Sequence, residues 1–187
     1  MPKIFIYPTD TIYGLGCKAI DRQAVLELFK IKKRDINKPM IVLVSSYCMA
    51  KEYFFISKKQ EKYLRTVWPR MSFDARKEKL DYKIKPSTVI LKSRGNLPKE
   101  LLGSDGSGAV RFPHYPLLIK EIKKIGVPIV STSLNISGKA PISDLKNIKK
   151  YFGRDISVLF EDSDFKPKKA SRLIDIRDID DVKVLRK

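Results

Sequence analysis

Tyr7-Pro8-Thr9-Asp10-Thr11-Ile12-Tyr13-Gly14-Leu15-Gly16 is the stretch that decides the fold, and it continues directly from the apolar residues 4–6. The run 4–7 predicts a short buried strand that Pro8 ends, and the Thr-Asp-Thr triplet predicts a turn before the next segment at 12–16. The hydroxyls and the carboxylate of this turn would face any crevice above the sheet. Taken alone, the triplet is also compatible with an ordinary polar turn.

Beyond this stretch, helical and strand-like apolar patterns alternate along the chain. Helical spacing and capping residues such as Asp21 predict helices at 24–32, 45–54, 57–67, 116–125 and 143–151. β-Branched runs predict further strands at 40–44, 88–91, 109–112, 127–130, 156–160, 173–176 and 182–185. The alternation predicts an α/β or α+β domain around one mixed sheet, with residues 1–187 as a single domain. Residues 70–84 are basic and poor in apolar side chains, which predicts a loop insertion.

The chain is strongly basic. Lysine and arginine number 39 against 21 acidic residues, which gives a formal net charge of +18 at pH 7. A field of that sign attracts polyanions such as nucleotides and RNA. A lysine-rich solvated surface would produce the same excess, so charge alone does not choose between these interpretations.

The cysteines and the hydropathy of the chain indicate in which cellular compartment the protein is expected. Cys17 and Cys48 lack metal-ligand spacing and are predicted to be reduced thiols. No apolar run approaches the ~20 residues that cross a bilayer. The first residues lead into a strand pattern rather than a signal peptide. The sequence therefore predicts a cytoplasmic protein that makes no use of a membrane.

Two polar clusters could carry chemistry. Lys32-Lys33-Arg34, followed by Lys38-Pro39, could clamp phosphates, although a charged helix end is often only a solvated face. The run Ser131-Thr132-Ser133-Leu134-Asn135-Ile136-Ser137-Gly138 follows a predicted strand and is interpreted as a loop suited to anions and ribose, with a Ser-rich turn as the plainer alternative.

Several common catalytic motifs are absent from the sequence. There is no Walker loop and no GxGxxG. His114 is the single histidine, so neither a histidine metal site nor a Ser-His hydrolase is indicated, and no metal ligands are assigned.

Five motifs in this order resemble the YrdC-like family of threonylcarbamoyl-AMP synthases over nearly the whole chain. They are the opening stretch 7–16, Lys32-Lys33-Arg34, Lys38-Pro39, Val110-Arg111-Phe112-Pro113 and the polar run 131–138. The resemblance implies a twisted open mixed sheet flanked by helices, with a basic central cavity that holds ATP, L-threonine and bicarbonate. It implies a nucleotidyltransferase, an L-threonylcarbamoyladenylate synthase that forms threonylcarbamoyl-AMP and pyrophosphate. Partner proteins then use this product to modify an adenosine of tRNA, and Mg²⁺ is expected to arrive with ATP.

The resemblance also assigns residues. It implies catalytic roles for Lys32, Arg34, Ser133 and Asn135. It implies ATP contacts by Arg34, Lys38, Ser107, Ser133, Asn135 and Arg186. It implies threonine contacts by Thr11, Arg111, Ser131 and Ser171.

Three departures from the family pattern stand out. The family's Trp-Pro-Gly-Pro-x-Thr stretch is split here, because residues 70–84 separate Trp68-Pro69 from Lys85-Pro86-Ser87-Thr88. Arg172 stands where the family has threonine, which could displace Ser171. No helix precedes the first strand, so one sheet face is expected to be less covered, or to be covered by a partner. An RNA-binding paralogue without synthase activity, acting on double-stranded RNA or tRNA, is the alternative.

Overall fold

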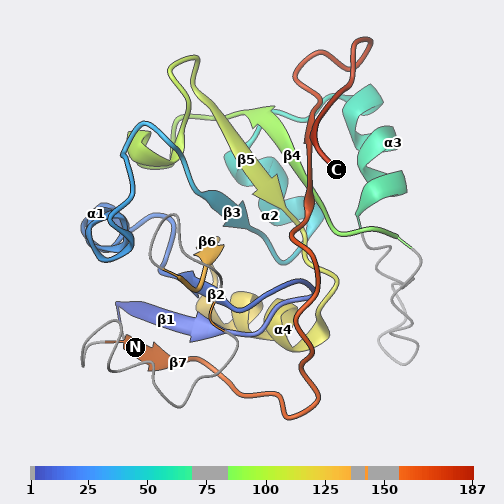
Figure 1. The fold of residues 1–187 in the computed structure, drawn as a ribbon. Helices are drawn as coiled ribbons and strands as arrows, with labels where there is room; N and C mark the ends of the chain where they lie inside the picture. The colour runs from blue at the N-terminus through green and yellow to red at the C-terminus, as the bar shows by residue number, and fades with distance from the viewer. Residues whose placement is uncertain (1–2, 69–83, 136–141, 143–155) are drawn as a thin grey trace.

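The computed structural model describes residues 3–68, 84–135, 142 and 156–187. Within these residues nine strands form one sheet in the order β7-β1-β2-β6-β3-β5-β4-β8-β9 (Figure 1). The strands are β1 (Ile4–Tyr7), β2 (Gly14–Gly16), β3 (Ile41–Leu43), β4 (Ser87–Lys92), β5 (Ser107–Arg111), β6 (Ile129–Ser133), β7 (Ile156–Val158), β8 (Arg172–Asp175) and β9 (Lys183–Arg186). The pairs β1/β7, β3/β5 and β4/β8 are parallel and the other pairs antiparallel, which confirms the predicted mixed sheet.

The helices of the described part begin where local signals predict. They are α1 (Arg22–Lys32), α2 (Tyr47–Tyr53), α3 (Lys58–Val67) and α4 (Pro116–Ile125), with a 3₁₀ turn η1 (Lys99–Leu101). Asp21 caps α1 by accepting from the Ala24 N–H at 3.0 Å, and Ser57 forms a capping box at the start of α3. None of these described helices is long and apolar enough to cross a membrane. The predicted helix 143–151 and the insertion 70–84, except Ile84, lie outside the described residues.

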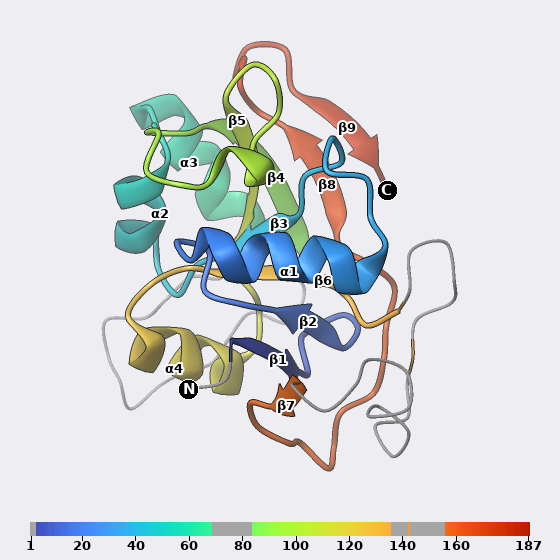
Figure 2. The ribbon, with the colours of Figure 1, turned by 90° about the vertical axis from the view of Figure 1, so that its left-hand side faces the viewer.

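Both faces of β1 are covered. Ile4 and Ile6 belong to the large core cluster that includes α1, while Phe5 and Tyr7 pack in a second cluster with residues of α4. In Figure 2, α1 runs in front of β6. The expectation of a less covered sheet face is therefore wrong for this strand, because its alternating side chains meet a helix on each side.

Strand β6 differs from the sequence-based prediction. The strand was expected at 127–130 with a polar loop after it, but it spans Ile129–Ser133. Ser133 pairs with Gly14 of β2, and Ser131 pairs with Ile41 of β3. Backbone pairing to two neighbouring strands outweighs the weak strand preference of serine, so the start of the predicted loop is a strand. Residues 136–138 of that run lie outside the described residues.

The glycine at the end of the opening stretch is required by a close backbone approach. A Cβ added to Gly16 would lie 1.9 Å from the carbonyl oxygen of Val130. The same carbonyl accepts a hydrogen bond from the Tyr7 hydroxyl at 2.9 Å. Tyr7 and Gly16 of this stretch thus hold β1 and β2 against β6 at Val130. Residues of this part of the sheet line the cavity described below.

Candidate functional site

A cavity of about 370 Å³ lies where the opening stretch meets β3, β5, β6 and the C-terminal strands. Its described lining consists of Thr9, Thr11, Ile12, Tyr13, Gly14, Arg34, Pro39, Met40, Ile41, Ala109, Arg111, Ser131, Thr132, Ser133, Ala170, Ser171, Leu173 and Arg186. Three guanidinium groups and several hydroxyls belong to this lining, and no carboxylate does. The cavity is therefore basic, as the sequence predicts, and suited to an anionic ligand.

Lys32 lies buried at the C-terminal end of α1, next to the cavity lining. Its Nζ donates to the carbonyl oxygens of Ser133 and Asn135 and to Oδ1 of Asn135, each at 2.5 Å. The Ser133 hydroxyl also donates to Asn135 Oδ1 at 2.5 Å. Burial, helped by the nearby Arg34, lowers the pKa of Lys32 to about 8. Three of the four residues predicted to be catalytic thus form one contact cluster.

Arg34, the fourth of these residues, lines the cavity from the segment after α1. Its Nε donates to the carbonyl oxygen of Lys38 at 2.7 Å, and Nη2 donates to that of Pro39 at 3.1 Å. Burial lowers the pKa of Arg34. These bonds fix the guanidinium against the chain that leads into β3.

Two predicted ATP contacts are not among the lining residues. The side chain of Lys38 is exposed to solvent. Ser107 is buried, and its hydroxyl donates to Oδ1 of Asp105 at 2.6 Å. Their contact with ATP stays a prediction.

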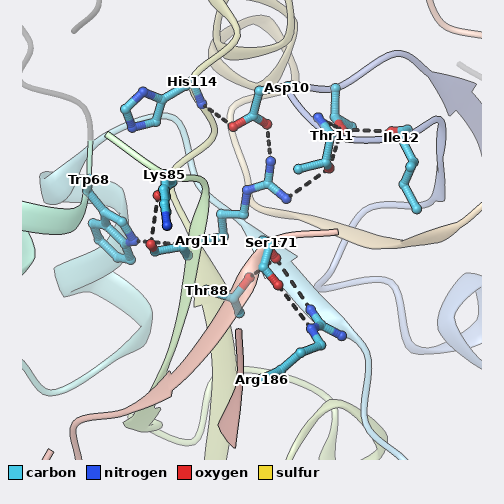
Figure 3. Close-up of polar contacts among 12 residues, drawn as sticks. Asp10, Thr11, Ile12, Trp68, Lys85, Thr88, Arg111, His114, Ser171 and Arg186 are labelled. Carbon is cyan, nitrogen blue, oxygen red and sulfur yellow. Dashed lines mark hydrogen bonds and ion pairs between the residues drawn. The ribbon is translucent and has the colours of Figure 1, made fainter. Parts of the chain in front are cut away.

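Arg111 lines the same cavity from the end of β5. Its Nη2 is ion-paired with Oδ1 of Asp10, and Nη1 donates to Oγ1 of Thr11 at 3.3 Å (Figure 3). The Asp10 carboxylate also accepts from the backbone N–H of His114 at 3.0 Å. Thr11 Oγ1 is in turn 2.9 Å from Oγ1 of Thr9. The Thr-Asp-Thr turn is thus a buried network on the cavity wall.

The C-terminal strands complete the cavity. Ser171 Oγ lies 2.8 Å from Oγ1 of Thr88, and Arg186 Nε donates to the Ser171 carbonyl oxygen at 3.0 Å (Figure 3). The guanidinium of Arg172 turns instead to Oγ of Ser87, with Nη2 at 2.9 Å. Arg172 therefore does not remove Ser171 from the cavity lining.

The structure brings most of the predicted site residues to this cavity. Thr11, Arg34, Arg111, Ser131, Ser133, Ser171 and Arg186 line it. Their individual roles stay predictions. The sequence placed the Asp10 carboxylate at a crevice and Thr88 in the split Trp-Pro motif, but it predicted neither the contact of Asp10 with Arg111 nor that of Thr88 with Ser171.

Comparison with known proteins places this geometry in a family. The model of the Sua5/YciO/YrdC family, described as "Telomere recombination", matches residues 2–187. The threonylcarbamoyl-AMP synthase of Buchnera aphidicola subsp. Schizaphis graminum is 33% identical over 161 residues, which cover 84% of this chain and 77% of the relative. That of Blochmanniella pennsylvanica is 28% identical over 187 residues, covering 98% and 87%.

Solved structures share the fold. P. abyssi Sua5 complexed with L-threonine superposes with a TM-score of 0.77 at 25% identity, over 98% of this chain and 50% of that chain. E. coli YciO gives a TM-score of 0.78 at 23% identity, over 100% and 83%. The chain thus spans about half the length of the P. abyssi protein, and the likeness to E. coli YciO supports the fold alone.

Proposed function

The chain belongs to the Sua5/YciO/YrdC family, and from this premise we propose that it is an L-threonylcarbamoyladenylate synthase. It would form threonylcarbamoyl-AMP and pyrophosphate from L-threonine, bicarbonate and ATP. The relatives that carry the name threonylcarbamoyl-AMP synthase match most of this chain. The observation that carries the proposal is the contact of Lys32 with Ser133 and Asn135 beside the Arg34 lining.

The cavity has the charges that this reaction needs. Bicarbonate first carboxylates the threonine amine: the amine nitrogen bonds to the bicarbonate carbon, a C–O bond breaks, and water and a proton are released. A carbamate oxygen then bonds to the α-phosphorus of ATP, and the bond to the bridging oxygen breaks as pyrophosphate leaves with the electron pair. Such nucleotidyl transfer depends on positioning and charge neutralisation rather than on a covalent enzyme intermediate. Arg34 on the lining and the Lys32 ammonium behind Ser133 and Asn135 would neutralise the phosphates.

Threonine would contact the part of the cavity lining that carries Arg111. P. abyssi Sua5 is complexed with L-threonine, and this chain has Thr11, Arg111, Ser131 and Ser171 on the cavity lining. The guanidinium of Arg111 suits the α-carboxylate, since paired N–H donors match two carboxylate oxygens. The amine would then point toward the phosphate end of the cavity, where the carbamate must form.

The described residues contain no candidate binding site for Mg²⁺. No group of three or more His, Cys, Asp or Glu side chains that could hold a metal occurs there, and the described cavity lining contains no carboxylate. Mg²⁺ binds well through nucleotide phosphates and water. We therefore propose that it enters as the ATP complex, and we assign it no ligand from these residues.

Further partners follow from the proposed reaction. The product is a reactive mixed anhydride, so a tRNA-modification protein would have to accept it and transfer the threonylcarbamoyl group to tRNA. The net charge of +18 would favour approach of tRNA in the cytoplasm.

Product formation tests the proposal directly. Purified protein is incubated with ATP, MgCl₂, bicarbonate and threonine, while pyrophosphate and the adenylate product are followed. We expect threonine-dependent product in the wild type, its loss in Lys32→Ala and Asn135→Ala, and its retention in Lys30→Ala, an exposed lysine of the same helix. Absence of product in the wild type, with tRNA or double-stranded RNA still bound, would favour the RNA-binding paralogue instead.

A further inference from the structure

Arg111 is a buried cation, and not all of its N–H donors have a hydrogen-bond partner among the described residues. The residue is 5% exposed, and the ion pair with Asp10 and the hydrogen bond to Thr11 use one N–H on each terminal nitrogen. Its Nε has no hydrogen-bond partner within the described residues. A guanidinium carries five N–H donors, and a buried donor without a partner is costly. This Nε is itself closed off from solvent, whereas the second N–H of Nη1 and that of Nη2 have no partner among the described residues and belong to a residue on the cavity wall. These two donors therefore indicate a place for an acceptor from outside the chain.

Asp10 determines how this guanidinium lies. Its carboxylate is buried and is held at both oxygens, since Oδ1 contacts Arg111 and Oδ2 accepts from the His114 backbone N–H at 3.0 Å. The backbone at His114 lies just beyond β5, the strand that carries Arg111. The Asp10 carboxylate thus connects the turn after β1 to the end of β5. Figure 3 shows the Arg111 guanidinium between Asp10 and Thr11.

We propose that Asp10 is a positioning residue, which orients Arg111 so that its remaining N–H donors bind the α-carboxylate of the amino-acid substrate. This inference rests on the proposed function, since it assumes that threonine is the ligand. The Asp10/Arg111 pair has no net charge, so recognition of the carboxylate depends on the direction of the donors more than on attraction from a distance. Loss of Asp10 would leave the positive charge in place and release its orientation.

This view makes a prediction that a purely structural role does not. If Asp10 only supported the fold, Asp10→Asn would leave the Arg111 charge uncompensated and would, if anything, strengthen the preference for a carboxylate over its uncharged analogue. If Asp10 positions Arg111, the same substitution would weaken that preference, because the donors lose their direction. The quantity to measure is therefore the ratio of the dissociation constants of L-threoninamide and L-threonine, obtained by calorimetry on the full chain.

We expect the wild type to favour threonine over threoninamide, and Asp10→Asn to reduce this ratio by about tenfold to hundredfold, as the loss of well-directed charge-assisted hydrogen bonds implies. Asp164→Asn is the matched control, because Asp164 is an exposed carboxylate on a neighbouring cavity of about 630 Å³ that Asp10 also lines. This control should leave the ratio unchanged. ATP affinity should stay within about twofold in both variants.

The outcomes separate the two proposals. A wild type that binds no threonine would overturn the proposed function and this inference with it. A wild type that discriminates, with a folded Asp10→Asn that discriminates equally well or better, would overturn the inference alone. If thermal melting shows that Asp10→Asn does not fold, Asp10→Glu takes its place, because it keeps the charge and moves the carboxylate by one methylene. The ratio should again fall, and an unchanged ratio in Asp10→Glu would refute positioning.

Discussion

The indole N–H of Trp68 donates to the carbonyl oxygen of Ser87 at 3.1 Å. This bond joins the two halves of the Trp-Pro motif that residues 70–84 separate in the sequence. Trp68 is fully buried, with its ring centroid 5.6 Å from that of Tyr47 and 6.3 Å from that of Phe112. Trp68, before the insertion, therefore contacts Ser87 at the start of β4, after it. Ser87 and Thr88 stay connected to the core although the motif is split in the sequence.

Trp68→Phe should lower the free energy of unfolding by about 1–3 kcal/mol, because it keeps an aromatic ring and leaves the Ser87 carbonyl without its donor. Trp68→Ala should cost about 3–5 kcal/mol through the additional cavity. Denaturant unfolding followed by circular dichroism measures both. Leu117→Ala, at an exposed position of α4, is the control and should change little. Equal stability of Trp68→Phe and the wild type would mean that the indole bond contributes nothing.

Gly16→Ala should prevent stable folding or lower stability by several kcal/mol. The new methyl would lie 1.9 Å from the Val130 carbonyl oxygen, a distance that only movement of β6 could relieve. Gly103→Ala is a suitable comparison, since its methyl would meet the Asp105 side chain at 3.1 Å and no backbone atom closer than 3.8 Å. Similar melting temperatures for the two variants would contradict the required approach of β2 and β6.

Local signals predicted the helices, whereas the strands depended on partners far along the chain. Asp21, Ser57 and Pro116 mark helix starts because a cap bonds within its own first turn. The strand β6 was misplaced because serines 131 and 133 are strand residues only by virtue of pairing with β3 and β2. No local pattern contains that information.

At the site, too, some contacts were predicted from the sequence and others were not. The motifs predicted that Lys32 and Asn135 belong together, and the structure places Nζ and Oδ1 in contact across 103 positions of sequence. The pairing of Asp10 with Arg111 across 101 positions was not predicted, because a polar turn residue next to a strand has many possible partners. Lys38 shows the converse, since its backbone carbonyl, rather than its ammonium, is what contacts Arg34.

ATP binding should weaken as the pH rises above about 8. Burial lowers the pKa of Lys32 to about 8, so the folded protein loses this proton at a pH where an exposed lysine would keep it. The neutral amine has two N–H donors for three oxygens and no charge to offer the phosphates. Calorimetry of ATP binding between pH 7 and pH 9.5, without threonine or bicarbonate, avoids titration of the substrate amine.

Lys32→Arg provides the control for this pH dependence, because a guanidinium stays protonated throughout the range. Its affinity for ATP should be lower than that of the wild type at pH 7 and should lack the decline near pH 8. A wild-type affinity that is constant to pH 9.5, or a decline that persists in Lys32→Arg, would show that Lys32 is not the titrating group.

Arg186→Ala should raise the KM for ATP by about tenfold and leave the KM for threonine within about twofold, if its guanidinium contacts the nucleotide as the family resemblance implies. The competing possibility follows from the structure, since Arg186 Nε donates to the carbonyl oxygen of Ser171, a predicted threonine contact. In that case the KM for threonine would rise instead, because the backbone of Ser171 would lose the hydrogen bond that holds it in place. Lys187→Ala removes a neighbouring exposed charge and should alter neither constant. Arg186→Lys separates charge from geometry, because lysine keeps the charge and loses the planar set of donors. A KM for ATP restored by lysine indicates attraction to phosphate, whereas a KM for threonine that stays raised indicates that the hydrogen bond to Ser171 is what matters.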